Sequence, residues 1–175
     1  MCGIAGIVLN SPGPVGQNLV EMLDGCQHRG PDSAGFALYK EPYPDRLVCR
    51  VHLNQLGPSP EAEAVTQKVF DVVESYGGRV LQSRFEYEDL RFEMQFSDDV
   101  RELSYAIEND VGVEIFSIGS SLEICKGVGT TAEVDKKYNI SKFYGTHGIG
   151  HVRLATESAV RANTAHPFWA YGFSN

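Results

Sequence analysis

A cysteine, Cys2, directly follows the initiator residue Met1. If Met1 is removed, Cys2 carries a free α-amino group on the same residue as its thiol. The reference pKa is about 7.7 to 8.0 for an α-amino group and about 8.5 for a thiol, so near neutral pH the amine can accept the thiol proton, directly or through water. Nucleophile and base then belong to one residue. The alternative is that the pair is accidental and that Cys2 simply precedes a strand of the core.

Three further blocks combine Gly, Arg, Asp, His and Pro residues in short spans: 28–35 (HRGPDSAG), 148–156 (GIGHVRLAT) and 163–168 (NTAHPF). Together with residues 1–6 (MCGIAG), and in this order, they resemble the class II glutamine amidotransferases. In that family the nucleophile is an N-terminal cysteine exposed by processing. The block at 148–156 resembles the family's strand with an arginine for the glutamine α-carboxylate. The block at 163–168 resembles the family's Asn-x-x-His-Pro turn.

The resemblance implies that Arg153 binds the α-carboxylate of glutamine. The planar guanidinium fork of arginine suits this role, because it can hold a carboxylate by two parallel hydrogen bonds. The alternative for Arg153 is an ion pair at the surface. Arg29 is expected to position the N-terminus or the substrate. Gly30 is expected to offer its backbone carbonyl close to the reacting centre, where a side chain would intrude.

Three other polar residues lie within the same blocks. Asp32 is either a turn residue or a functional one, and the sequence leaves both open. We expect His28 and His166 to be structural, because an N-terminal amine removes the need for a histidine base.

The resemblance is narrower around residues 145–151 and 155–158, which look most like stand-alone amidotransferase subunits of the glutamate synthase type. The long segment between Leu53 and Thr146 agrees with that branch. The implied reaction is attack of Cys2 on the side-chain amide of glutamine, release of ammonia and hydrolysis of a γ-glutamyl thioester. Ammonia would pass to a synthase partner subunit. The sequence leaves the ammonia acceptor and the oligomeric state open.

The resemblance fails at one point. The family forms its oxyanion hole with an Asn-Gly pair and binds the substrate amine with the carboxylate of a Gly-Asp pair, and neither pair stands in a suitable position before Asn175. We therefore expect the chain to be the N-terminal portion of a longer protein. Two alternatives remain: an N-terminal nucleophile amidase for another amide, which would not need Arg153, and a non-catalytic regulatory or interaction subunit.

Hydrophobic periodicity and turn residues predict the elements that position these residues. We expect strands near residues 4–9, 33–39, 47–53, 80–87, 90–96, 113–118, 122–125 and 145–156, and helices near 19–26, 60–76 and 98–107. The strands at 113–118 and 122–125 should form a hairpin around Gly119 and Ser120. Alternation along 47–53 predicts that His52 faces solvent.

These elements indicate an α+β protein. The resemblance implies the αββα sandwich of the N-terminal nucleophile hydrolases, represented by its N-terminal portion over residues 1–175. The order of elements between 58 and 138 predicts an inserted α+β module with a core of its own. We expect this module to serve association with a partner.

Composition excludes several classes of function. Of the 175 residues, 42% are apolar, and 15 basic against 23 acidic residues give a formal charge of −8, which disfavours nucleic acid and anionic membranes as partners. No apolar run is long enough for a membrane helix and no signal peptide begins the chain, so we expect a cytoplasmic protein. Cys2, Cys26, Cys49 and Cys125 lack metal-ligand spacing. We therefore expect no metal and no cofactor in this chain; any flavin or iron-sulfur cluster would belong to the partner.

Overall fold

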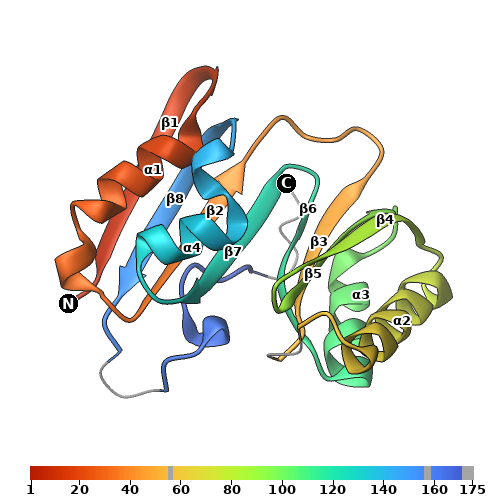
Figure 1. Cartoon of the computed structure of the whole chain (residues 1–175). Helices are drawn as coiled ribbons and strands as arrows, with labels where there is room; N and C mark the ends of the chain where they lie inside the picture. Colours follow the sequence, from red (N-terminus) through yellow and green to blue (C-terminus); the bar gives the residue numbers. More distant parts are fainter. Residues whose placement is uncertain (55–56, 156–158, 171–175) are drawn as a thin grey trace. The chain divides into compact units, whose positions relative to one another are not determined.

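The computed structural model describes residues 1–54, 57–155 and 159–170, and the chain divides into two compact units (Figure 1). The first unit combines Met1–Glu41 with Ile124–Phe168, and the second consists of Pro42–Glu123 and the described residues after Phe168. Within the described ranges, no helix is both long enough and apolar enough to cross a membrane.

The first unit contains a four-stranded sheet in the order β1-β8-β2-β7. Its strands are β1 (Gly3–Gly13), β8 (Gly145–Arg153), β2 (Ser33–Tyr39) and β7 (Leu122–Val128). Strand β8 lies between β1 and β2 and pairs antiparallel with both. Two blocks of the resemblance, residues 1–6 at the start of β1 and residues 148–156 along β8, are thus neighbours in one sheet (Figure 1).

One face of this sheet packs against two α-helices. The longer of the two is α1 (Val15–Asp24). Leu19 and Leu23 of α1 approach β8 so closely that a Cβ at Gly148 would lie 2.9 Å from Leu19 Cδ1, and one at Gly150 would lie 2.6 Å from Leu23 Cδ1. The glycines of β8 therefore allow the helix to approach the sheet. Helix α4 (Thr131–Tyr138) packs beside α1, and the short helices η1 (Gln27–Arg29), η3 (Ile140–Lys142) and η4 (Ala162–Thr164) complete the unit.

The other face of β1 and β8 carries apolar side chains that are exposed. The exposed fraction is 74% for Ile4, 82% for Val8 and 48% for Ile149. Val8 pairs with His147 and Ile4 pairs with His151, so these side chains belong to one face. Contiguous exposed apolar side chains on a sheet are typical of a surface that another layer covers.

The second unit contains a second antiparallel sheet in the order β4-β5-β3-β6. Its elements are β3 (Leu47–His52), α2 (Pro60–Ser75), β4 (Arg79–Glu86), β5 (Asp89–Gln95), α3 (Val100–Ala106), the π-helix η2 (Ile107–Val111) and β6 (Glu114–Gly119). Cys49, Phe92 and Met94 of the sheet form one core with Val69 of α2 and Leu103 of α3. The predicted start of α2 is confirmed, because the Ser59 side chain accepts a hydrogen bond from the Ala62 backbone N–H at 3.2 Å.

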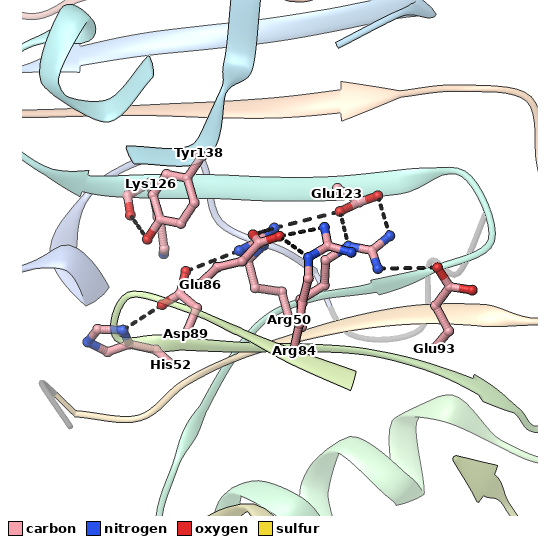
Figure 2. Close-up of polar contacts among 10 residues, drawn as sticks. Arg50, His52, Arg84, Glu86, Asp89, Glu93, Glu123, Lys126 and Tyr138 are labelled. Atoms are coloured by element: carbon pink, nitrogen blue, oxygen red, sulfur yellow. Dashed lines mark hydrogen bonds and ion pairs between the residues drawn. The ribbon is translucent and has the colours of Figure 1, made fainter. Parts of the chain in front are cut away.

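The opposite face of the second sheet carries a buried network of charges (Figure 2). Arg50 contacts Glu86 at 2.7 Å and Asp89 at 3.4 Å, and Asp89 also lies 3.0 Å from Nδ1 of His52. His52 is only 6% exposed, so the prediction that it faces solvent was wrong. Alternation assigned His52 to the correct side of the strand, but that side is buried, and Asp89 provides a polar partner for the His52 ring there.

The strand order departs from the sequence prediction at one point. Strands β6 and β7 were expected to form a hairpin, yet β6 pairs with β3 while β7 belongs to the first sheet. Both strands are almost completely buried and show no alternation, so their sequence carries no signal for a pairing partner. Helix α4, which begins with a capping box formed by Thr130 and Glu133, was not predicted.

The compact second unit and the expected module have different bounds. The unit spans Pro42–Glu123, whereas the module was expected over 58–138. Strand β3, which precedes residue 58, is an inner strand of the second sheet. Residues 124–138 belong to the first unit, because β7 joins the first sheet and α4 contacts α1.

Candidate active site

Cys2 lies at one end of the first sheet, where β1 and β2 begin and β8 ends. Gly3 pairs with Val152, and Ser33 pairs with Arg153. Continuing the register of β1 and β8 by one residue places Cys2 opposite Arg153. Residues directly opposite each other in an antiparallel pair project to the same face of the sheet. Cys2, whose side chain is exposed, therefore adjoins the end of the sheet at which Arg153 lies.

Gly30 packs against the backbone of β8 beside this edge. A Cβ at Gly30 would lie 2.4 Å from the carbonyl carbon of Val152 and 2.5 Å from the nitrogen of Arg153. No other residue fits this contact without a shift of the backbone. The carbonyl of Gly30 accepts a hydrogen bond from Gln27 Nε2 at 2.9 Å, and Gln27 Oε1 accepts one from the Thr131 backbone N–H at 2.7 Å. The side chain of Gln27 therefore connects the Gly30 turn to the start of α4.

Arg29 lies on the surface next to the N-terminus. Its Nη2 donates to the Met1 sulfur at 3.6 Å, and its side chain is exposed. The contact places Arg29 beside Met1, and its role in positioning the N-terminus or the substrate stays a prediction. His28, on the same short helix, is also exposed.

Arg153 is half-buried, and its guanidinium is oriented by the segment that follows β8. Nη1 of Arg153 donates to Thr164 Oγ1 at 2.9 Å. The Thr164 hydroxyl in turn lies 3.1 Å from the carbonyl oxygens of Ala159 and Arg161. These contacts connect the block at 148–156 to the turn at 163–168.

Asp32 holds the backbone on both sides of Leu154, directly after Arg153, a role that the sequence did not distinguish from that of a simple turn residue. Its backbone N–H donates to the Arg153 carbonyl at 3.1 Å, and its carboxylate accepts from the Ala155 N–H at 2.7 Å. The Asp32 carbonyl accepts from the Gly129 N–H at 2.9 Å. Asp32 therefore determines where the chain runs as it leaves β8.

We expect Asp32→Ala to lower the free energy of unfolding by about 1.5 to 3 kcal/mol, because a hydrogen bond to a charged, partly buried acceptor is lost. Urea denaturation measures this change. Asp24→Ala is the matched control, since Asp24 is exposed at the end of α1 and should alter the free energy by less than about 0.5 kcal/mol. Equal values for the two variants would show that Asp32 does not hold the strand end.

Two histidines occupy the same face of the sheet as Arg153. His151 precedes Arg153 by two residues on β8, and its ring lies 4.6 Å from the ring of His166. A Cβ at Gly35, which pairs with His151, would lie 2.1 Å from the His166 carbonyl oxygen, so the turn containing His166 lies directly on the sheet. The sequence prediction assigned His166 a structural role and did not consider His151 as a site residue. His151 lies two residues before Arg153 on a predicted strand, and this spacing indicates that both side chains share one face.

Both imidazoles are neutral at neutral pH. Burial, followed by the proximity of His166 and Arg153, lowers the pKa of His151 to about 4. Burial, followed by Arg153 and Lys126, also lowers the pKa of His166. Nδ1 of His151 is buried and has no hydrogen-bond partner among the residues that the structure describes. The neutral rings therefore add no positive charge of their own beside the guanidinium of Arg153.

The described part of the chain contains no group of three or more His, Cys, Asp or Glu side chains placed to hold a metal ion. Residues 156–158, at the end of the third block, and residues 171–175 lie outside the described residues. Among the described cysteines, Cys2 is exposed, Cys26 is half-buried, and Cys49 and Cys125 are buried. Burial raises the pKa of the Cys49 thiol.

No protein-family model matches the chain. The chain is 31% identical over 176 residues to a protein of Methanothermobacter thermautotrophicus described as a putative glutamine amidotransferase, covering 98% of this chain and 57% of the relative. It is 33% identical over 171 residues to the glutamine amidotransferase-like protein GlxB of Rhizobium meliloti, covering 96% and 54%. A third match, 31% identical over 77 residues and covering 43% and 13%, is to a glutamine-fructose-6-phosphate aminotransferase of Francisella tularensis.

The chain thus spans about half the length of the first two relatives. The match to each of them includes nearly all of this chain and both of its compact units. This similarity supports a relationship of the chain to the glutamine amidotransferase family.

Proposed function

We propose that this chain carries the nucleophile and the carboxylate-binding arginine of a class II glutamine amidotransferase. The single observation that carries the proposal is the register of β1 and β8, in which Gly3 pairs with Val152, so that Cys2 and Arg153 are the next residues beyond this pair at the same end of the sheet. A glutamine that binds Arg153 through its α-carboxylate has its side-chain amide free to extend toward the thiol. The relatives named as glutamine amidotransferases support the choice of substrate.

The proposed reaction begins after removal of Met1. The α-amine of Cys2 takes the thiol proton, and the thiolate attacks the amide carbon of glutamine. The tetrahedral intermediate collapses as the C–N bond breaks, and the departing nitrogen receives the proton and leaves as ammonia. Water then adds to the γ-glutamyl thioester, the C–S bond breaks, and glutamate and the free thiol result. No electron transfer occurs, so the reaction requires no redox cofactor.

The chain's own residues orient these steps. Arg153 holds the α-carboxylate by paired hydrogen bonds, and Asp32 and Thr164 hold Arg153 in place. Gly30 keeps its turn against β8 because no side chain separates the two backbones. Arg29 lies beside Met1 and is proposed to position the N-terminus or the substrate.

We further propose that the first unit is part of an N-terminal nucleophile hydrolase sandwich. The exposed apolar side chains of Ile4, Val8 and Ile149 support this proposal, because α1 and α4 cover one face of the sheet and a second layer would cover the other. An αββα arrangement meets this requirement. The ammonia would pass to a synthase subunit, for which the glutamate synthase type is our proposal, and the second unit would serve association with that subunit.

Removal of Met1 tests the mechanism on the protein as cells produce it. We expect intact-mass measurement to show that Met1 is absent from active preparations, since the mechanism needs a free amine on Cys2. Hydrolysis of glutamine is measured on the same preparation by the release of ammonia. Acetylation of the N-terminus provides the control, because it blocks the amine and should abolish activity while the thiol remains. Complete retention of Met1 together with undiminished hydrolysis would contradict the mechanism.

A further inference from the structure

The charge of the chain is divided unequally between the two units. The segment Pro42–Glu123 contains sixteen of the 23 acidic residues and seven of the 15 basic ones, which gives a formal charge of −9. The remaining residues contain seven acidic and eight basic side chains and have a formal charge of +1. The net negative charge of the chain therefore lies in its second unit. A basic surface is attracted to this unit electrostatically more strongly than a neutral or acidic one.

A groove of about 620 Å³ lies within the second unit, where the end of α2 meets α3 and η2. The rings of Tyr76 and Tyr105 and the methyl group of Ala106 provide its apolar lining. Tyr105 is 66% exposed and Tyr76 is 41% exposed. Large aromatic side chains at this exposure are typical of the centre of a protein interface, because they supply contact area at little cost in conformational entropy.

The charged residues of this groove are mainly acidic. Asp99 caps α3 and also contacts Arg101, with Oδ2 and Nη2 3.2 Å apart, so the positive charge of Arg101 is balanced within the groove. Glu102 and Asp110 are exposed, and among the residues that the structure describes no ion pair involves either of them. Two carboxylates therefore remain in excess beside the two tyrosine rings.

We propose that this groove binds a basic segment of a partner protein, with arginine or lysine side chains placed between the tyrosine rings and the carboxylates. A guanidinium can stack on a tyrosine ring while it donates hydrogen bonds to a carboxylate, so the two kinds of side chain act on the same cation. The negative charge of the unit attracts such a segment and repels nucleic acid and acidic surfaces. The inference rests on the proposed function, in which the partner is the synthase subunit that receives ammonia.

The chemistry of the groove is tested with a defined probe. The probe is an acetylated and amidated hexapeptide of alternating glycine and arginine, and the control peptide has citrulline, a neutral analogue of the same shape, at each arginine. Binding to the whole protein is followed by chemical-shift changes in NMR titrations at low salt. We expect the citrulline peptide to bind at least about fivefold more weakly, and perturbed resonances to include those of Tyr76 and Tyr105.

Two double variants separate the groove from the general acidity of the unit. Glu102→Gln with Asp110→Asn removes the two carboxylates of the groove and should weaken binding of the arginine peptide about fivefold. Glu61→Gln with Glu63→Gln removes the same charge from the first turn of α2, at the opposite end of a 16-residue helix, and should change the affinity by less than about twofold. Tyr105→Ala should weaken binding about fivefold through loss of the ring.

A loss confined to the groove variants supports the proposal. Equal binding of the two peptides, or equal losses in the two double variants, overturns it. Circular dichroism establishes that each variant is folded. Glutamine hydrolysis is measured in parallel and should stay within twofold in every variant, because the groove belongs to the second unit and contains no residue of the candidate active site. If the unmodified protein fails to hydrolyse glutamine, the proposed function is wrong. The titrations still show whether the groove binds a basic segment.

Discussion

Replacing Cys2 with alanine is expected to reduce glutamine hydrolysis by about 10⁴-fold or more, as removal of a catalytic nucleophile does in other hydrolases. Cys2 is exposed and precedes β1, so loss of its sulfur should leave the free energy of unfolding almost unchanged. Release of ammonia and of glutamate from the protein as cells produce it, under saturating glutamine, measures the change. Cys2→Ser offers a graded comparison, because a hydroxyl is a weaker nucleophile in the same position.

Cys49→Ala is the control for loss of a thiol. Cys49 lies in the core of the second unit, and burial raises the pKa of its thiol, so it contributes no thiolate near neutral pH. Its replacement should leave the rate within about twofold once folding is verified, at a cost in stability typical of a small core truncation. Undiminished hydrolysis by Cys2→Ala would mean that another group is the nucleophile. A protein that hydrolyses no glutamine even with Cys2 intact would favour the non-catalytic alternative.

Arg153→Lys is expected to raise the KM for glutamine by about 10- to 100-fold with a smaller effect on kcat, because a point charge replaces a fork that can make two parallel hydrogen bonds. Steady-state kinetics measures both constants. Arg161→Lys is the matched control on the same segment, since Arg161 is exposed, and its KM should change by less than about twofold.

A substrate analogue makes the assignment of Arg153 specific. 4-Aminobutanamide is glutamine without its α-carboxylate, and the unmodified protein should discriminate strongly against it. In Arg153→Lys the discrimination between the two amides should decrease, because the carboxylate and the guanidinium form one interaction and their losses are not additive. Unchanged discrimination would remove Arg153 from the substrate site and would favour an amidase for another amide.

Local signals in the sequence determined much of the secondary structure. Ser59 followed by Pro60 predicted the start of α2, and the hydrogen bond from the Ala62 N–H to the Ser59 side chain confirms it. Hydrophobic periodicity predicted the strands β3 and β5. These signals depend on residues a few positions apart, whose capping, periodicity and burial are properties of the local chain.

The residues of the candidate site were also named from the sequence, through short blocks that resemble a family. Cys2, Arg29, Gly30 and Arg153 were chosen without knowledge of their distances, and their roles in glutamine chemistry remain predictions. The structure adds that the blocks meet at one end of one sheet. It also adds the contacts of Asp32 with Arg153 and Ala155, which join positions more than a hundred residues apart.

Only the tertiary structure decided which strands pair and which polar faces are buried. Strands β6 and β7 are separated by two residues yet belong to different sheets, because pairing depends on partners that are distant in the sequence. His52 was predicted to be exposed and is buried, and its Nδ1 lies 3.0 Å from Asp89, which also contacts Arg50 on the same strand as His52. Local periodicity tells which side of a strand a residue occupies. What covers that side depends on the whole fold.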